Sequence, residues 1–380
     1  LSFAESLRHI GVQIHPSTLN IILPVGISFY TFHGISYVID IYYGKIKAER
    51  DFIHYGLFVS FFPLLVAGPI ERATHLLPQL KKPRTFRYDK AVNGLRQILW
   101  GLFKKVVIAD NCATIANEVF QNHHGASGST LLMGAFFFTV QIYGDFSGYS
   151  DIALGTARLF GIELLRNFSF PYISRDIAEF WRRWHISLSS WFRDYLYIPL
   201  GGSKGGLWSK IRNTFIIFLV SGFWHGANWT FVAWGLLNAI YFLPLLILNK
   251  NRSNLETVAM GKLLPNPKEA IQMMVTFLMT MLAWIFFRAA TVGQAFEIIK
   301  RIFSSTLFSV PKHLDSFCLI TIGLVLFFFL IEWLGREQKF GIEVFLEKKK
   351  KVWRWGFYFC LMILMLLFGG QKQQFIYFQF

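Results

Sequence analysis

Long apolar stretches alternate with shorter polar and basic ones along this 380-residue chain. Eight of the stretches are long enough, or nearly so, to cross or enter about 30 Å of hydrocarbon at about 1.5 Å of helix per residue. The pattern predicts an all-α polytopic membrane protein with roughly seven to nine such helices, folded as a single membrane domain over residues 1–380. The stretches are residues 19–43, 52–70, 92–119, 131–162, 213–248, 271–290, 317–335 and 352–370.

Composition supports a membrane protein and decides how the charge is interpreted. Hydrophobic residues make up 54% of the chain and charged residues only 16%, which is outside the usual range of soluble domains. The net charge of +16 comes from Lys and Arg residues in the loops between apolar stretches. Positive loops orient a protein in the bilayer, so we expect a lipid environment and no nucleic-acid partner. The chain begins with Leu1, and neither an initiator Met nor a signal-peptide pattern explains this start. We therefore also expect N-terminal helices to be missing from this chain.

The same loops predict an orientation. Basic loops 71–90 and 174–212 are expected to face the cytoplasm, and the uncharged loop 121–130 is expected to face outward. Stretch 52–70 has basic residues on both sides, so counting the crossings makes it a re-entrant hairpin. Its Pro63 and its Gly68-Pro69 pair fit a broken helix surrounded by protein.

Metal and disulfide chemistry is not expected. The three cysteines form no CxxC pair and lie in no Cys/His cluster, so neither a disulfide framework nor a structural zinc site is predicted. The adjacent His123 and His124 would need further ligands nearby to hold a metal. We therefore interpret them as ordinary loop residues.

Residues 163–212 are too charged to span a membrane and too apolar for a free loop, which is typical of an amphipathic element at the inner interface. Arg182 and Arg193 fall on its polar face, where they fit either phosphate binding to a donor or a basic face toward lipid headgroups. The apolar face is a single helical stripe in which His185 points with the tryptophans. The stripe consists of Trp181, Trp184, His185, Leu188, Trp191, Phe192 and Tyr195.

A second histidine, His225, lies in apolar stretch 213–248. Both ends of this stretch are basic, so it should form a pair of short helices with His225 at or beside the apex. Burial favours the neutral imidazole, which can accept a hydroxyl proton and return it, as acyl transfer to an alcohol requires. Asn228 is a possible polar neighbour. A satisfied core histidine is the alternative, and spacing does not exclude it.

Asp145 is expected near the middle of stretch 131–162, where a carboxylate is costly unless it is paired or faces water. Tyr149 lies one turn further along the same helix face. The carboxylate is either functional or the centre of a structural hydrogen-bond network, and both interpretations stay open. Gly148 and Gly155 in the same stretch predict close packing against another helix.

Several reaction classes lack their signatures. No GxSxG sequence occurs, and the glycine-rich GGSKGG (201–206) lacks the GK[ST] ending of a phosphate-binding loop. A proton-coupled transporter or flippase would use intramembrane His and Asp residues, but it should show paired broken helices in two corresponding halves. No such symmetry is present, and the residues by themselves indicate a membrane protein with an inward-facing titratable site.

Five segments carry a family resemblance. They resemble the membrane-bound O-acyltransferase family and look most like its bacterial alginate O-acetyltransferase branch, which includes peptidoglycan O-acetyltransferases. The match extends over almost the whole chain. The segments are FFPLLVAGPIERA (61–73), YGDFSGYSDIALGTARLFGI (143–162), NFSFPYISRDIAEFWRRWHISLSSWFRDYLYIPLGGSKGG (167–206), SGFWHGANWTFVAWG (221–235) and FIYFQF (375–380).

The resemblance implies a multi-helix fold with re-entrant helices and a tunnel through a bacterial inner membrane. A cytoplasmic acyl thioester, such as acetyl-CoA, would meet a polysaccharide hydroxyl from the outer side, without a cofactor or metal. A periplasmic acetyltransferase or another polysaccharide-modification protein is an expected partner. D-alanyl transfer to teichoic acid is the alternative within the family. The essential histidine falls on His225 and the second polar position on His185, and the expected substrate or donor contacts are Asp145, Tyr149, Trp181, Arg182, Arg193 and Asn228.

Overall fold

The computed structural model describes residues 26–345, 349–371 and 373–376, and within these it contains helices and no β-strand. This confirms the all-α prediction. Four described helices are long and apolar enough to cross a membrane, and each matches a predicted stretch or half of one. They are α11 (Trp229–Ile247), α12 (Pro267–Arg288), α14 (Ser316–Leu334) and α15 (Lys351–Phe368).

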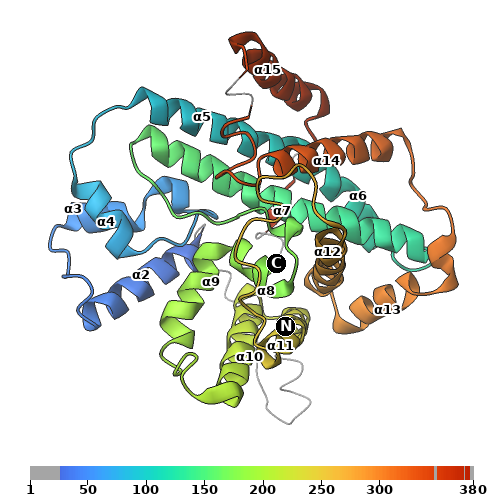
Figure 1. Cartoon of the computed structure of the whole chain (residues 1–380), viewed down its shortest axis with the longest axis horizontal. Helices are drawn as coiled ribbons and strands as arrows, with labels where there is room; N and C mark the ends of the chain where they lie inside the picture. Colours follow the sequence, from blue (N-terminus) through green and yellow to red (C-terminus); the bar gives the residue numbers. More distant parts are fainter. Residues whose placement is uncertain (1–25, 346–348, 372, 377–380) are drawn as a thin grey trace, which may run out of the picture.

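The remaining helices differ widely in length (Figure 1). The predicted stretch 19–43 begins outside the described residues, and its described part forms α2. In chain order these helices are α2 (Ile27–Tyr42), α3 (Phe52–Val59), α4 (Ala73–Lys81), α5 (Tyr88–Leu102), α6 (Asp110–Gln121), α7 (Gly128–Leu159), α8 (Ile177–Arg183), α9 (Ile186–Phe192), α10 (Gly206–His225) and α13 (Val292–Ile302).

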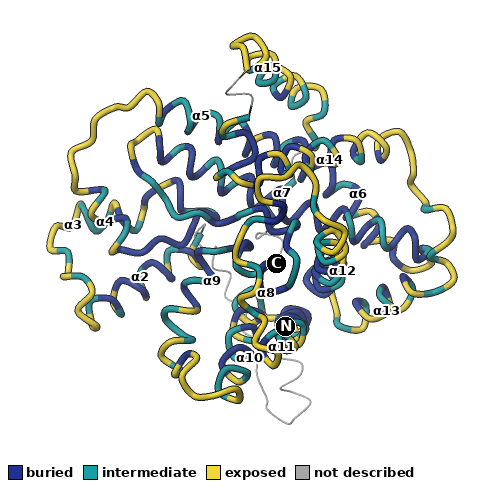
Figure 2. Tube along the Cα trace, viewed as in Figure 1, coloured by how far each residue is buried: buried dark blue, intermediate teal, exposed yellow. Residues whose placement is uncertain are grey.

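Helix α7 runs through the middle of the molecule with α5 and α6 packed along it (Figure 1). Its 32 residues make it roughly 48 Å long. Most of them are buried, as Figure 2 shows. At this length the helix exceeds about 30 Å, the thickness of the hydrocarbon core of a bilayer.

Two glycine pairs let α5 and α7 approach backbone to backbone. A Cβ on Gly148 would lie 2.8 Å from the carbonyl oxygen of Gly101, and a Cβ on Gly155 would lie 2.5 Å from that of Gly94. Real Cβ atoms do not come this close to a backbone oxygen. The close packing predicted at Gly148 and Gly155 is therefore confirmed, and each partner is a glycine of α5.

Two predicted stretches are broken into shorter helices. Stretch 52–70 forms α3 and then a single 3₁₀ turn, Phe62–Leu64, that contains Pro63. Stretch 213–248 forms α10 and α11, joined by residues 226–228, which confirms the predicted pair of helices. The two helices pack tightly because Gly222 faces the carbonyl oxygen of Phe231, which lies 2.3 Å from where its Cβ would be.

The aromatic stripe does not form a single helix, and this part of the sequence prediction is wrong. Helix α8 ends at Arg183, His185 adopts a left-handed backbone with φ of 43°, and α9 begins at Ile186. Trp181, Trp184, Leu188 and Phe192 still line one cavity, but they come from two helices and the break between them. The cause is a chain segment packed against the break, described below.

The glycine contacts between α5 and α7 generate a stability prediction. Gly148→Ala or Gly155→Ala places a methyl group against a backbone oxygen, so each should destabilise the fold by about 1–3 kcal/mol. The expected result is a lower apparent unfolding temperature in detergent, followed by fluorescence-detected size exclusion. Gly323→Ala in α14 is the control, because a Cβ there meets no atom within 4 Å, and it should be neutral or stabilising. Equal behaviour of all three variants would contradict the packing argument.

Candidate functional site

The break at His185 is held by a strand-like pairing with the segment that follows α7. The Ile186 amide donates to the Asn167 carbonyl oxygen at 2.9 Å, and the Ser169 amide donates to the Arg183 carbonyl oxygen at 2.9 Å. These bonds take up backbone groups that a continuous helix would have used. A left-handed backbone is unfavourable for a residue with a side chain, so this pairing must hold His185 in place.

The side chain of Asn167 fixes the protonation pattern of His185. Asn167 Oδ1 accepts from Ser187 Oγ at 3.0 Å and lies 2.9 Å from His185 Nδ1. It also accepts from the Ser187 backbone amide, which can only donate, so the amide orientation is set. Nδ1 of His185 must then carry the proton, which leaves the lone pair on Nε2. That Nε2 is buried and has no hydrogen-bond partner among the described residues.

A third segment, the one around Gly68-Pro69, anchors this arrangement. The Ile70 amide donates to Ser187 Oγ at 2.9 Å, and the next amide, of Glu71, donates to His33 Nε2 at 3.1 Å. The fully buried carboxylate of Glu71 also contacts His75 of α4, and this hydrogen bond raises the pKa of His75 above its usual value despite partial burial. Segments 61–73, 167–170 and 184–187 therefore meet around His185.

His225 is the last residue of α10, and aromatic rings from three helices surround it. Its ring centroid lies 4.7 Å from that of Trp224, 5.2 Å from that of Trp234 and 5.0 Å from that of Phe287. Trp224 is also the ring that approaches His185, at 6.4 Å. Both histidines line one chamber of about 130 Å³. Its other lining residues are Trp181, Trp184, Leu188, Ser189, Phe192, Ile217, Phe218, Ser221 and Trp234.

A larger, polar cavity of about 500 Å³ adjoins the chamber, and we call it the vestibule. The two spaces share Ser189, Ile217 and Phe218 as lining residues, so these three side chains form the neck between them. The vestibule has a basic wall, in contrast to the aromatic chamber, and its rim is exposed. The cations of this wall are Arg193, Lys210 and Arg252.

Two of the predicted contact residues line these cavities. Trp181 lines the chamber, where its ring packs edge-on against Phe218 and Trp234, and its buried Nε1–H has no partner among the described residues. Arg193 lines the vestibule and pairs with the neighbouring Asp194 at 2.8 Å. Trp181 therefore brings this unpartnered ring N–H to the wall of the chamber, while Arg193 brings positive charge to the vestibule.

Arg182 and Asn228 lie outside the two cavities and make structural contacts. Arg182 donates from both terminal nitrogens to the carbonyl oxygens of Asn251 and Asn254, at 2.7 Å each. It thus holds the loop that carries Arg252 of the vestibule. Asn228 caps α11 by accepting the Thr230 amide at 3.1 Å. A role of either residue in donor or substrate contact stays a prediction.

Asp145 and Tyr149 lie on α7 and line neither cavity. Asp145 forms a 2.8 Å ion pair with Lys105 and accepts the Ile376 amide at 2.7 Å. The ring of Tyr149 packs on Phe375 at 5.6 Å. Both residues hold the C-terminal segment, of which 377–380 lie outside the described residues, and their predicted substrate contact stays a prediction.

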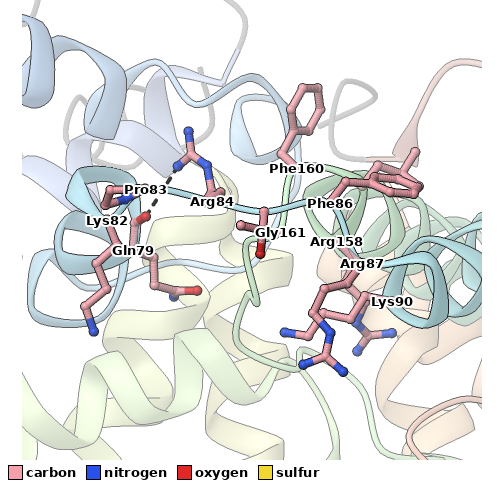
Figure 3. A pocket seen from close by; sticks show the side chains of 12 residues that line it. Gln79, Lys82, Pro83, Arg84, Phe86, Arg87, Lys90, Arg158, Phe160 and Gly161 are labelled. Carbon is pink, nitrogen blue, oxygen red and sulfur yellow. Dashed lines mark hydrogen bonds between the residues drawn. The ribbon is translucent and has the colours of Figure 1, made fainter.

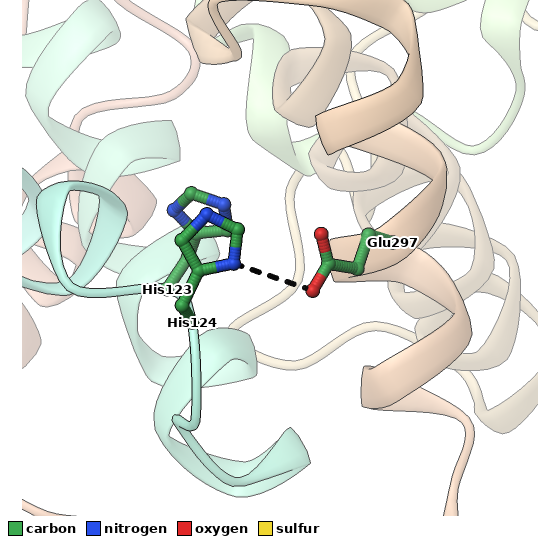
Figure 4. A group of neighbouring side chains, drawn as sticks. All are labelled: His123, His124 and Glu297. Atoms are coloured by element: carbon green, nitrogen blue, oxygen red, sulfur yellow. Dashed lines mark ion pairs between the residues drawn. The ribbon is translucent and has the colours of Figure 1, made fainter.

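The loop histidines His123 and His124 gain a neighbour that the sequence did not indicate. Helix α13 brings Glu297 toward them, with His124 Nδ1 3.6 Å from its carboxylate (Figure 4). The two imidazole rings contact one another at 3.8 Å, and His123 Nδ1 lies 3.1 Å from the Phe120 carbonyl oxygen. The group shares no residue with the chamber or the vestibule, and its contacts tie the loop to α13.

Three residues of the site were missed from the sequence. Asn167 was not singled out because it lies 18 residues from His185 and no periodicity connects the two. Lys210 and Arg252 were counted only as loop charges. Their one available signal was their position at the two ends of stretch 213–248, which a hairpin would bring together.

Comparison with known proteins identifies relatives that match most of the chain. A sequence model of the membrane-bound O-acyltransferase family matches residues 46–289. The chain is 40% identical over 303 residues to the probable alginate O-acetylase AlgI of Pseudomonas aeruginosa, covering 80% of this chain and 56% of that protein. It is 38% identical over 312 residues to the peptidoglycan O-acetyltransferase of Helicobacter pylori, covering 75% and 58%.

A teichoic acid D-alanyltransferase of Bacillus subtilis is less similar, at 31% identity over 239 residues and 60% of either chain. The chain spans little more than half the length of the alginate and peptidoglycan relatives. Both histidines, Asn167 and all three cations of the vestibule lie inside the region that the family model matches.

The Asn167 network generates a prediction that needs no activity assay. Asn167→Ala and Ser187→Ala each remove a partner of one shared hydrogen bond, so their effects on the apparent unfolding temperature should not add. The expected coupling is about 0.5–3 kcal/mol, as found for residues in one network. Asn167→Ala combined with Ser60→Ala is the control, because the Ser60 hydroxyl bonds only within α3, and that pair should be additive. Additivity in both pairs would refute the network.

Proposed function

Because the chain belongs to the membrane-bound O-acyltransferase family, we propose that it is an O-acetyltransferase that carries an acetyl group from a thioester donor to a polysaccharide hydroxyl. The observation that carries this proposal is the aromatic chamber lined by His185 and His225, with its basic vestibule. A neutral base beside an enclosed apolar space suits a hydroxyl nucleophile. A cationic vestibule suits a phosphorylated carrier.

In the proposed reaction His225 is the general base. It takes the proton of the acceptor hydroxyl while that oxygen attacks the thioester carbonyl carbon. The tetrahedral intermediate then collapses, so that a C–O ester bond replaces the C–S bond. The leaving thiolate receives the proton from the His225 imidazolium. The Nε1–H of Trp181 is a donor available for the oxyanion.

His185 has a different role in this proposal, because its tautomer is fixed. Its Nε2 lone pair accepts a hydrogen bond from the acceptor hydroxyl or from an ordered water, and so orients the nucleophile toward His225. Asn167 keeps the lone pair on that atom throughout the reaction. His185 is thus an orienting residue, and its ring has no need to change protonation.

We propose a coenzyme A thioester as the donor, bound with its phosphates in the vestibule. Lys210 and Arg252 have no carboxylate within ion-pair distance among the described residues, whereas Arg193 is paired with Asp194. The two unpaired cations are therefore the better phosphate contacts. The acyl chain would pass the neck at Ile217 and Phe218 to reach the chamber. No metal or cofactor is required by this scheme.

The names of the relatives support a polysaccharide as the acceptor. The alginate and peptidoglycan O-acetylating relatives are more similar to this chain than the D-alanyltransferase, which favours a carbohydrate hydroxyl and an acetyl group. We propose that the protein lies in a bacterial cytoplasmic membrane with loops 71–90 and 174–212 inside. The acceptor polymer would then approach from outside, together with a periplasmic acetyltransferase or another polysaccharide-modification protein as partner.

The first functional test is the loss of the base. His225→Ala and His225→Gln should each lower acetyl transfer by about 10²–10⁴-fold, the usual contribution of a positioned base. His185→Ala should lower it less, by about 10–100-fold, as loss of an orienting group does. Base-labile acetyl esters on the polymer, measured in membranes with matched protein levels, are the readout. His54→Gln on α3 is the control and should be neutral. A stably folded His225→Ala protein with full turnover would refute the mechanism.

The donor site has its own test. Lys210→Gln and Arg252→Gln should each raise the KM for acetyl-CoA by roughly tenfold or more, since each removes a charge-assisted contact, while kcat stays constant. With acetyl-pantetheine, which lacks the phosphates, the variants and the wild type should have equal KM values. Lys204→Gln on the exposed 201–206 loop is the control. Unchanged KM values for acetyl-CoA would place the phosphates elsewhere.

A further inference from the structure

A second basic cavity lies at the opposite end of α7 from Gly128, and we call it the α7 cleft. It has a volume of about 460 Å³ and is formed by the end of α4, the linker to α5, the first turn of α5 and the turn after α7 (Figure 3). It shares no lining residue with the chamber or the vestibule. The proposed acetyl transfer therefore leaves it unexplained.

The cleft carries more positive charge than its own carboxylates balance. Five cations line it: Lys82, Arg84, Arg87, Lys90 and Arg158. Glu163 pairs with Lys90 at 3.3 Å and with Arg158 at 3.0 Å, and Asp89 pairs with Arg87 at 2.8 Å.

Lys82 and Arg84 are the unbalanced cations. In the part of the chain that the structure describes, neither has a carboxylate within ion-pair distance. Arg84 donates only to the carbonyl oxygens of Gln79 and Leu80, at 3.3 and 3.4 Å. These two contacts point its guanidinium along the wall of the cleft. Two uncompensated cations in the lining of one cavity attract an anion such as a phosphate.

The rim of the cleft identifies the kind of phosphate. Phe86 is 76% exposed and Phe160 is 50% exposed, and the ring of Phe160 meets the exposed Phe62 edge to face at 5.8 Å. Exposed aromatic rings beside Lys and Arg are the pattern of a membrane interface, where apolar surface contacts acyl chains and cations contact headgroups. A site for a soluble phosphate would not need this apolar rim.

We propose that the α7 cleft binds the headgroup of an anionic phospholipid, with Lys82 and Arg84 attracting its phosphate and with its acyl chains along Phe86 and Phe160. The exposed aromatic rings beside the cations place the cleft at the level of a membrane interface, where headgroups are found. Under the orientation proposed above, this is the inner leaflet.

The lipid would also brace the segment that holds His185. Gln79, which lines the cleft, exchanges two hydrogen bonds with the backbone of Glu163, at 2.9 and 3.0 Å. Two residues further on, the Leu165 amide donates to the buried Glu71. The segment then reaches Asn167. Lipid bound in the cleft therefore supports the base of the loop that positions His185.

The test is binding of phosphatidylglycerol to the purified protein in nanodiscs, compared with phosphatidylcholine as a zwitterionic reference. Wild type should bind phosphatidylglycerol selectively, as measured by native mass spectrometry, and should unfold at a higher temperature in its presence. The Lys82→Gln, Arg84→Gln double variant should lose at least tenfold in affinity. A Lys262→Gln, Lys268→Gln double variant carries the same charge change on exposed residues outside the cleft and should bind like wild type.

The experiment also includes a single-residue variant and two soluble phosphate compounds. Lys82→Gln alone removes no described intramolecular contact, so it tests the site even if Arg84→Gln disturbs the end of α4, and it should weaken binding several-fold. Inorganic phosphate and glycerol 1-phosphate should not stabilise wild type at millimolar concentration. Equal lipid affinity of the cleft variants and the controls would overturn the proposal. Stabilisation by the soluble phosphates to the same extent would overturn the lipid as the source.

Discussion

The rest of the site depends on the interruption of the helix at His185. A continuous helix would carry the aromatic stripe past the chamber in regular rotation, and its backbone would need no outside partner. The left-handed residue instead turns α9 away from α8, and backbone bonds from Asn167 and Ser169 replace those that the helix has lost. Inside a membrane protein such replacement is obligatory, because an unsatisfied backbone group there costs several kcal/mol.

The same constraint explains the buried charges around α7. Lys104 pairs with Asp151 and bonds Ser147, and Glu332 of α14 accepts from both Trp100 and Tyr143. A buried carboxylate or ammonium is tolerated only with a close partner, and removing one partner is far more costly than losing a surface pair. Asp145 with Lys105 belongs to this set. Such pairs fix the register of α7 against its neighbours, which in turn sets the position of both ends of that helix.

Much of this architecture could be predicted from periodicity. Stretches of apolar residues located α7, α12, α14 and α15, and the basic flanks of 213–248 predicted a hairpin with His225 near its apex. The glycines of α7 predicted close packing. These features are encoded locally, in the length of a segment or in the spacing of small residues along one helix, so a single sequence contains them.

The features that could not be predicted depend on contacts between residues that are distant in the sequence. No glycine or proline marks the helix break at His185 in the sequence. The break is caused by the backbone pairing with Asn167, which is distant in sequence. The sequence pattern from Trp181 to Tyr195 is compatible with one amphipathic helix, and only the packed segment excludes it. Arg182 carries a guanidinium that could bind phosphate, and its position in the sequence suggests this role. In the structure the guanidinium donates to the carbonyl oxygens of Asn251 and Asn254, about seventy residues away, which a single sequence does not reveal.

The two histidines of the chamber are held by different forces, and the proposed mechanism gives them different roles. His185 is fixed by directional hydrogen bonds that permit one tautomer, with the proton on Nδ1 and the lone pair on Nε2. His225 stands at a helix end and packs against the rings of Trp224, Trp234 and Phe287. The proposed mechanism accordingly places proton transfer at His225 and orientation of the hydroxyl at His185.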